Sequence, residues 1–266
     1  MTLPFGARRR ADRHCCPRLI GRSPMAAADL GEPRAPARVP AFDPESIPHD
    51  PDFALPAERG APVPIERLSA AALRRRIGDP PAWTPELRSD GRWRSTEAPI
   101  RPAAVLMPLL IDAPVPTVLL TRRSAHLQEH AGQVSFPGGR ADASDRDRVH
   151  TALRETEEEI GLPSAAVDVI GALPPYLTAT GYEVTPVIGL IERAPVLRLD
   201  RFEVAEAFEV PLAFLMDPAN HERRRIDFAG AARTFYAMPW TGAARRYFIW
   251  GATAAMLRNL YQLLRA

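Results

Sequence analysis

The spacing of apolar residues along the chain alternates between a strand period and a helix period, which predicts a mixture of both elements. Two short apolar runs at 103–111 and 117–121 flank a Pro-containing segment and predict a strand hairpin. Helical spacing predicts helices over 69–77 and 252–264. Other short apolar runs predict strands at residues 133–136, 167–173, 184–191, 233–238 and 245–250.

The mixed order of these elements favours the α/β class, arranged as an α/β/α sandwich around a mixed sheet. Twelve of the 29 prolines fall in the first 65 residues, where neither a strand period nor a helix period is sustained. We therefore predict a disordered, Pro- and Arg-rich leader over 1–65, a short helix and linker over 66–94, and one folded domain over 95–266.

The clearest periodic segment is a central amphipathic helix. Its cap is expected at Ser144 or Asp145, and Gly161 stands where a left-handed residue ends a helix. The inward-facing positions recur at the helical spacing i, i+3, i+4, i+7 and i+11. They are Val149, Ala152, Leu153, Thr156 and Ile160.

Three carboxylates share one face of this helix. Glu155, Glu158 and Glu159 lie at i, i+3 and i+4, and their mutual repulsion predicts a cation beside them. Hard oxygen ligands suit Mg²⁺ or Mn²⁺, which also bind substrate phosphates. Arg154 can pair with Glu158 one turn away.

The alternative interpretation of these acids is a solvated helix face. The Gly138-Gly139 turn before the helix favours the metal site, because glycines let the backbone approach an anion or a metal shell. The exit through Ile160-Gly161-Leu162, rather than through more charge, favours it as well.

The charge balance argues against a nucleic-acid partner. Residues 1–25 hold six arginines and one acid, a net charge of +5, and the rest of the chain carries −3. The N-terminal arginines lack the apolar stretch of a secretory signal, and a basic tail, an organelle transit peptide or a start at Met25 would each explain them. All 34 basic residues are arginine, which excludes a lysine-dependent mechanism.

The cysteine content and the length of the apolar runs indicate in which cellular environment we expect the protein. The two cysteines, Cys15 and Cys16, are adjacent, and no His/Cys spacing matches a zinc site. Apolar runs are far shorter than the ~20 residues of a membrane span. We expect a cytoplasmic protein with no membrane partner, and the sequence is compatible with a homodimer.

Other candidate chemistries find little support in the sequence. No phosphate-binding Gly-x-x-x-x-Gly-Lys loop occurs, and Ser135 lacks a Gly-x-Ser-x-Gly context. His126 and His130 lie in a loop-like stretch, where hydrogen bonding is favoured over metal ligation.

Two sets of charged residues outside the helix are further candidates. Arg122 and Arg123 follow a predicted strand and suit phosphate, but alternation along a strand puts them on opposite faces. Three acids, Glu203, Glu206 and Glu209, recur every three residues before Pro211. They are either the polar flank of a loop, or one of them supplies a carboxylate as a remote ligand or general base. For that role we favour Glu206.

The helix and its preceding turn resemble the Nudix box, Gly-x5-Glu-x7-Arg-Glu-U-x-Glu-Glu-x-Gly-U, where U is bulky and apolar. The matching positions are Arg154, Glu155, Glu158, Glu159, Gly161 and Leu162. Three departures occur: Gly139 lies 15 residues before Arg154 rather than 14, an Asp-rich turn (Asp142, Asp145) replaces the early Glu, and Thr156 occupies an apolar position.

The residues before the box resemble the signature of the coenzyme A pyrophosphatase subgroup of this superfamily. They are Leu119–Ser124 and Gly132–Gly139, followed downstream by similar stretches at 173–176, 180–187 and 208–212. Gln128 stands where that signature usually has Arg.

The resemblance implies a Nudix-type sandwich and Mg²⁺- or Mn²⁺-dependent cleavage of the diphosphate of coenzyme A, a small-molecule nucleotide substrate. It implies catalytic roles for Glu155, Glu158, Arg154 and Glu206, metal binding by Glu155, Glu158 and Glu159, and substrate contacts from Arg122, Arg123, Gly138 and Gly139. Two alternatives stay open. One is hydrolysis of another nucleoside diphosphate derivative such as ADP-ribose, which Gln128 favours. The other is a ligand-sensing module without activity, which the complete set of three carboxylates disfavours.

Overall fold

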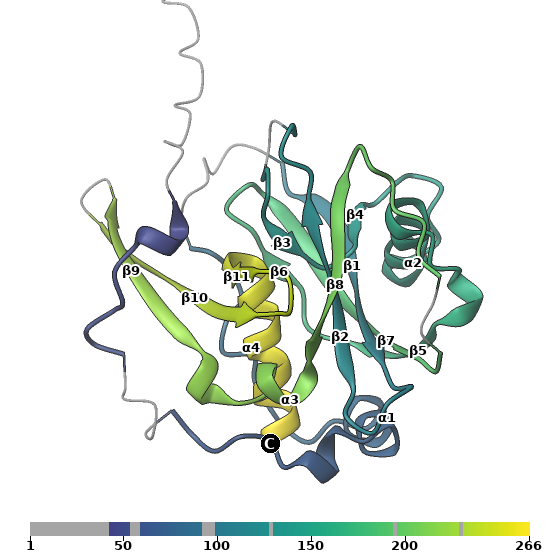
Figure 1. The fold of residues 1–266 in the computed structure, drawn as a ribbon, viewed down its shortest axis with the longest axis horizontal. Helices are drawn as coiled ribbons and strands as arrows, with labels where there is room; N and C mark the ends of the chain where they lie inside the picture. Colours follow the sequence, from purple (N-terminus) through teal and green to yellow (C-terminus); the bar gives the residue numbers. More distant parts are fainter. Residues whose placement is uncertain (1–42, 54–58, 92–98, 128–129, 194–195, 229–230) are drawn as a thin grey trace, which may run out of the picture. The chain divides into compact units, whose positions relative to one another are not determined.

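A mixed sheet of eight strands organises the chain (Figure 1). The computed structural model describes residues 43–53, 59–91, 99–127, 130–193, 196–228 and 231–266. The strands of the larger sheet are β1 (Arg101–Leu110), β2 (Thr117–Arg123), β3 (Val134–Ser135), β4 (Gly138–Arg140), β5 (Asp168–Ala172), β6 (Tyr176–Leu177), β7 (Tyr182–Ile191) and β8 (Val204–Pro211).

The strand order in the larger sheet is β3-β2-β1-β7-β5, with β4 paired to β1, β6 to β7 and β8 to β2. The central pair, β1 and β7, is parallel from Arg101↔Tyr182 to Leu110↔Ile191. The predicted hairpin between β1 and β2 is confirmed, because Leu110 pairs with Thr117 in an antiparallel register. A second, antiparallel sheet has the order β11-β10-β9, and its strands are β9 (Glu222–Phe228), β10 (Ala231–Thr241) and β11 (Arg246–Trp250).

Alternation along the central strands creates two apolar faces, and each is covered by a helix. Ala104 and Leu106 of β1 share a buried cluster with α2, whereas Met107 and Leu109 belong to the other cluster with α1 and α4. Figure 1 shows α2 and α4 on opposite sides of the larger sheet. The predicted α/β/α arrangement with a mixed sheet is therefore confirmed. The helices are α1 (Ala70–Gly78), α2 (Arg148–Ile160), α3 (Leu212–Leu215) and α4 (Gly251–Arg265), and the 3-10 turns are Pro44–Ser46, Ile65–Leu68, Ser164–Ala166 and Pro218–Asn220.

The predicted boundary of the leader at residue 65 differs from the structure. Residues 43–266 form one compact unit, and within its first segment His49 forms an antiparallel bridge with Arg224 of β9. The Asp50 N–H donates to the Arg223 carbonyl at 2.8 Å, and the Arg223 guanidinium contacts the Asp50 carboxylate at 2.7 Å. Val63 is buried and its N–H donates to the Met216 carbonyl. These contacts are made with distant residues, so local composition could not reveal them. Residues 1–42 and 54–58 of the predicted leader lie outside the described part of the chain.

Strands β8 and β9 were not predicted. In β8, Glu206 and Glu209 interrupt the apolar alternation, which suggested a polar flank. In β9, four of the seven residues are Glu or Arg. Both segments become strands because β2 and β10 supply their hydrogen-bond partners.

Candidate active site

Strand β4 brings two glycines against the acidic face of α2. The Gly138 N–H donates to Glu159 Oε2 at 3.0 Å. Gly138 has a φ of +143°, and a Cβ there would lie 2.5 Å from backbone atoms of Ala104 and Val105. At Gly139, a Cβ would lie 2.3 Å from Glu155 Oε2. The sequence predicted a turn at these glycines, but they are part of strand β4, paired with Ala104 and Val105 of β1. They lie against two of the three predicted carboxylates, and the close approach needs glycine.

The carboxylates of α2 differ strongly in exposure. The Glu159 side chain is 8% exposed, that of Glu155 is 20% exposed, and that of Glu158 is 61% exposed. Burial, followed by weaker repulsion from Glu203 and Glu155, raises the pKa of Glu159 to about 7 despite the Gly138 N–H and Arg123. Burial also raises the pKa of Glu155, despite its bond to Arg154. For both carboxylates, burial therefore outweighs the positive charge of the nearby Arg154 and Arg123.

Arg154 is the cation at the centre of the acidic cluster. Its Nη1 donates to Glu155 at 2.8 Å and to Glu158 at 3.1 Å, so the predicted pairing with Glu158 is confirmed. Its Nε and Nη2 donate to both oxygens of Asp145, each at 2.8 Å. This bidentate pair holds the pKa of Asp145 far below its usual range, although burial opposes the change. Hydrogen bonds from Thr151 and His150 lower the pKa further.

The helix cap differs from the expectation. Asp147, rather than Ser144 or Asp145, is the N-cap of α2, and its carboxylate accepts the His150 N–H at 2.8 Å. Asp145 is committed to Arg154, and the Ser144 hydroxyl donates to Asp142. The C-terminal prediction is confirmed, because Gly161 has a φ of +69° and its N–H donates to the Glu157 carbonyl.

The three predicted metal ligands share a face but do not meet at one point. Within the described ranges, no three His, Cys, Asp or Glu side chains converge as a metal-binding group. Arg154 holds Glu155 and Glu158, while Gly138 holds Glu159. The residues nevertheless fit a hard divalent cation. Glu155 and Glu159 supply carboxylate oxygens, and they lie beside the neighbouring glycines Gly139 and Gly138. The pKa values of both carboxylates are raised, and a bound cation would favour their charged forms.

The two arginines of β2 lie on opposite faces, as strand alternation predicted. Arg123 Nη1 is 3.8 Å from Glu159 Oε1, on the α2 side of the sheet. Its Nε is buried and has no hydrogen-bond partner among the described residues. Arg122 Nε instead donates to Glu206 at 3.2 Å. Only Arg123 is brought to the predicted carboxylates.

The structure does not bring Glu206 to the acidic helix. Glu206 lies opposite Arg122 in the β2–β8 register and accepts the Tyr247 hydroxyl at 2.6 Å. Although burial opposes the change, the bonds from Tyr247 and Arg122 lower the pKa of Glu206. Glu203 is the acid of this series whose charge acts on Glu155 and Glu159. The sequence signal was the same for both residues, but Glu203 lies in the turn before β8 and Glu206 lies within β8, opposite Arg122.

The histidines of the preceding loop do not join the carboxylates. His130 Nδ1 lies 2.9 Å from Gln133 Oε1, in agreement with a hydrogen-bonding role. His126 packs against the ring of Phe202. Gln128, the departure from the subgroup signature, lies outside the described residues.

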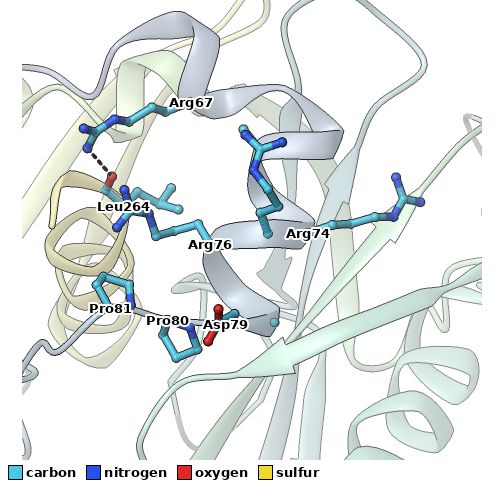
Figure 2. A pocket seen from close by; sticks show the side chains of 10 residues that line it. Arg67, Arg74, Arg76, Asp79, Pro80, Pro81 and Leu264 are labelled. Carbon is cyan, nitrogen blue, oxygen red and sulfur yellow. Dashed lines mark hydrogen bonds between the residues drawn. The ribbon is translucent and has the colours of Figure 1, made fainter.

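A concavity of about 620 Å³ lies elsewhere, between α1 and the end of α4 (Figure 2). None of the predicted site residues lines it. Its arginines have local partners: Arg67 donates to the Leu264 carbonyl at 3.3 Å, and Arg74 donates to Asp168 at 2.9 Å. Figure 2 shows Arg74 extending away from Arg76 and Leu264, so the basic side chains do not converge on one point.

Residues 100–226, from just before β1 into β9, match the NUDIX domain family. The Uncharacterized Nudix hydrolase NudL of Escherichia coli (strain K12) is 44% identical over 160 residues, which are 60% of this chain and 81% of that protein. The protein of the same name from Shigella boydii serotype 4 (strain Sb227) matches with the same identity and coverage. The chain belongs to the Nudix hydrolase family.

Solved structures of this family are more distant. The MutT protein from Methanosarcina mazei Go1 is 23% identical, covers 46% of this chain and 83% of its own, and has a TM-score of 0.37. A NUDIX hydrolase from Alicyclobacillus acidocaldarius is 22% identical, covers 44% of this chain and 81% of its own, and has a TM-score of 0.38.

No helix in the described ranges is long and apolar enough to span a membrane.

Proposed function

We propose that this Nudix hydrolase cleaves the diphosphate linkage of coenzyme A or an acyl-coenzyme A. The products would be 4′-phosphopantetheine, or its acyl form, and adenosine 3′,5′-bisphosphate. The observation that carries the proposal is the signature Leu119–Ser124 and Gly132–Gly139 directly before the acidic helix. The NudL relatives support the hydrolase class and leave the substrate open.

Glu155, Glu158 and Glu159 are the residues that would hold Mg²⁺ or Mn²⁺. When bound, the ion would neutralise diphosphate charge and lower the pKa of a coordinated water. Gly138 and Gly139 would keep the backbone close to Glu159 and Glu155. Arg154 would orient Glu155 and Glu158 from its anchor on Asp145.

Arg123 is the side chain we assign to substrate phosphate. Its Nη1 lies 3.8 Å from Glu159 Oε1, on the side of the predicted carboxylates, and a guanidinium suits a phosphate oxyanion. Arg122 contacts Glu206, which lies away from the acidic helix. We therefore assign Arg122 a supporting role in the sheet.

Glu203 replaces Glu206 in our proposal as the carboxylate from outside the helix. Its backbone is fixed on both sides, because its N–H donates to the Asp200 carbonyl and its carbonyl accepts the Ser124 N–H at 2.8 Å. These bonds fix the backbone from which the Glu203 carboxylate extends, and a carboxylate near the acidic helix is suited to orienting a water or completing a metal shell.

The experiment is product analysis with coenzyme A, acetyl-coenzyme A, dephospho-coenzyme A, ADP-ribose and NADH, each with Mg²⁺ and with Mn²⁺. We expect coenzyme A to be cleaved with the highest kcat/KM. Charge-assisted contacts to its 3′-phosphate are worth roughly 1.5–3 kcal/mol, which predicts at least a tenfold preference over dephospho-coenzyme A. Arg123→Ala should reduce that preference more than Arg122→Ala.

Two results separate the levels of the proposal. Equal or better kcat/KM for dephospho-coenzyme A and ADP-ribose would reject coenzyme A specificity and favour the nucleoside diphosphate alternative. No cleavage of any of the five compounds would reject the enzyme assignment for this substrate class and favour a ligand-sensing module.

A further inference from the structure

Two aromatic side chains from different loops meet at the solvent-exposed end of β2 and β8. The rings of His126 and Phe202 have centroids 4.9 Å apart and an interplanar angle of 60°. Both side chains are exposed, and Phe202 retains 66% of its accessible surface. Among the exposed large apolar side chains of the described residues, Phe202 is the one aromatic.

The backbone ties this pair to the candidate active site. The Ser124 N–H donates to the Glu203 carbonyl at 2.8 Å, and the Ser124 hydroxyl donates to the Arg201 carbonyl at 3.2 Å. Phe202 lies between these two acceptors, and Ser124 directly follows Arg123. The loop carrying the pair is therefore fixed beside the arginine that faces Glu159.

A second tether connects the Phe202 loop to α2. The Asp200 N–H donates to the carbonyl of Glu159 at 2.9 Å, and the Asp200 carboxylate accepts the Phe202 N–H at 2.9 Å. These bonds fix the backbone of Phe202, and its ring contacts His126 while remaining mostly exposed to water. An aromatic side chain has only two χ angles, so it loses little conformational entropy when a flat ligand stacks on it.

We propose that Phe202, supported by His126, is the platform on which the aromatic base of the substrate's nucleotide half stacks. Every nucleobase offers a flat π-face, and stacking on aromatic side chains contributes affinity without selecting one base. The phosphates would then lie toward Arg123 and the carboxylates, and the other half of the substrate would extend away from the base. The inference rests on the proposed function only in requiring that the ligand contain a nucleotide.

Binding of etheno-AMP tests the platform without any cleavage step, because this fluorescent adenine analogue contains no diphosphate linkage. We expect wild-type protein to quench its fluorescence, and Phe202→Ala to weaken binding by about tenfold with loss of the quench. Phe202→Tyr should retain both signals, whereas Phe202→Leu, which keeps an apolar side chain, should lose them. His126→Ala should weaken binding less. Ile65→Ala, at an exposed apolar side chain in the turn before α1, is the matched control and should bind as wild type.

Steady-state kinetics provide the second measurement. If the proposed cleavage occurs, Phe202→Ala should raise KM by about tenfold with kcat within threefold and the melting temperature unchanged. Unaltered etheno-AMP binding in both Phe202→Ala and Phe202→Leu, or no binding by wild type, would overturn the platform. Loss of quench in those variants together with no cleavage of any substrate would support the platform while rejecting the proposed function.

Discussion

Substitution of Gly139 by alanine tests the candidate active site at one atom. A Cβ at this position would lie 2.3 Å from Glu155 Oε2, whereas ordinary contacts begin near 3.4 Å. The carboxylate must therefore move by about 1.1 Å, as the difference of those two distances requires. The obstacle is the far end of a flexible side chain, and Gly139 does not have a positive φ, so the fold should accommodate the change.

The cost should appear in activity rather than in stability. A displacement of about 1 Å in a catalytic group can reduce the rate by ~10²-fold, equivalent to about 2.7 kcal/mol of transition-state stabilisation. We expect Gly139→Ala to lower kcat/KM by this factor at saturating Mg²⁺, to require more Mg²⁺ for half-maximal activity, and to leave the melting temperature within about 2 °C of wild type.

Two other glycines supply matched controls. At Gly78, the last residue of α1, a Cβ meets nothing within 4 Å, so Gly78→Ala should retain both activity and stability. At Gly138, the added Cβ would meet backbone atoms at 2.5 Å with φ at +143°, so Gly138→Ala should unfold at a clearly lower temperature. A Gly139→Ala protein with wild-type kcat/KM and Mg²⁺ dependence would refute the assignment of Glu155 as a metal ligand.

Three further predictions address the charges and the first segment. Glu158→Gln should lower turnover by at least ~10²-fold without unfolding, since Glu158 is exposed, whereas Glu157→Gln on the other side of the helix should not; equal rates in the two variants would contradict the metal site. The lowered pKa of Asp145 stabilises the fold above its unfolded pKa of about 3.9, and this contribution is lost as the pH falls, so the melting-temperature advantage over Asp145→Asn should shrink below about pH 4; an advantage independent of pH would exclude the linkage. Deleting residues 1–42 should leave the melting temperature and the activity unchanged. Deletion through residue 65 should lower the melting temperature, because it removes the buried Val63 and the Asp50–Arg223 ion pair. Equal melting curves for the two deletions would show that these contacts do not contribute to stability.

The sequence by itself determined the elements that have strong local periods. The stripe from Val149 to Ile160 and the left-handed Gly161 defined α2, because a helix repeats every 3.6 residues and ends where a residue without a Cβ is favoured. The apolar runs defined β1, β2 and β7, because strands that are buried on both faces need a continuous apolar sequence. The acidic face and the position of the two glycines before it could be predicted because their spacing along the chain is short, although the glycines form part of strand β4 rather than a turn.

Only the tertiary structure decided which charged residues meet. Glu203 and Glu206 have equivalent local sequence signals, but Glu203 lies in the turn before β8, whereas Glu206 lies within β8, where the register with β2 places it opposite Arg122. The sequence predicted Asp145 as a possible helix cap, but in the structure both of its carboxylate oxygens accept hydrogen bonds from Arg154, nine residues later. The contact between His126 and Phe202 joins residues 76 positions apart. Long-range pairing of this kind depends on strand register and loop tethers, which no local pattern encodes.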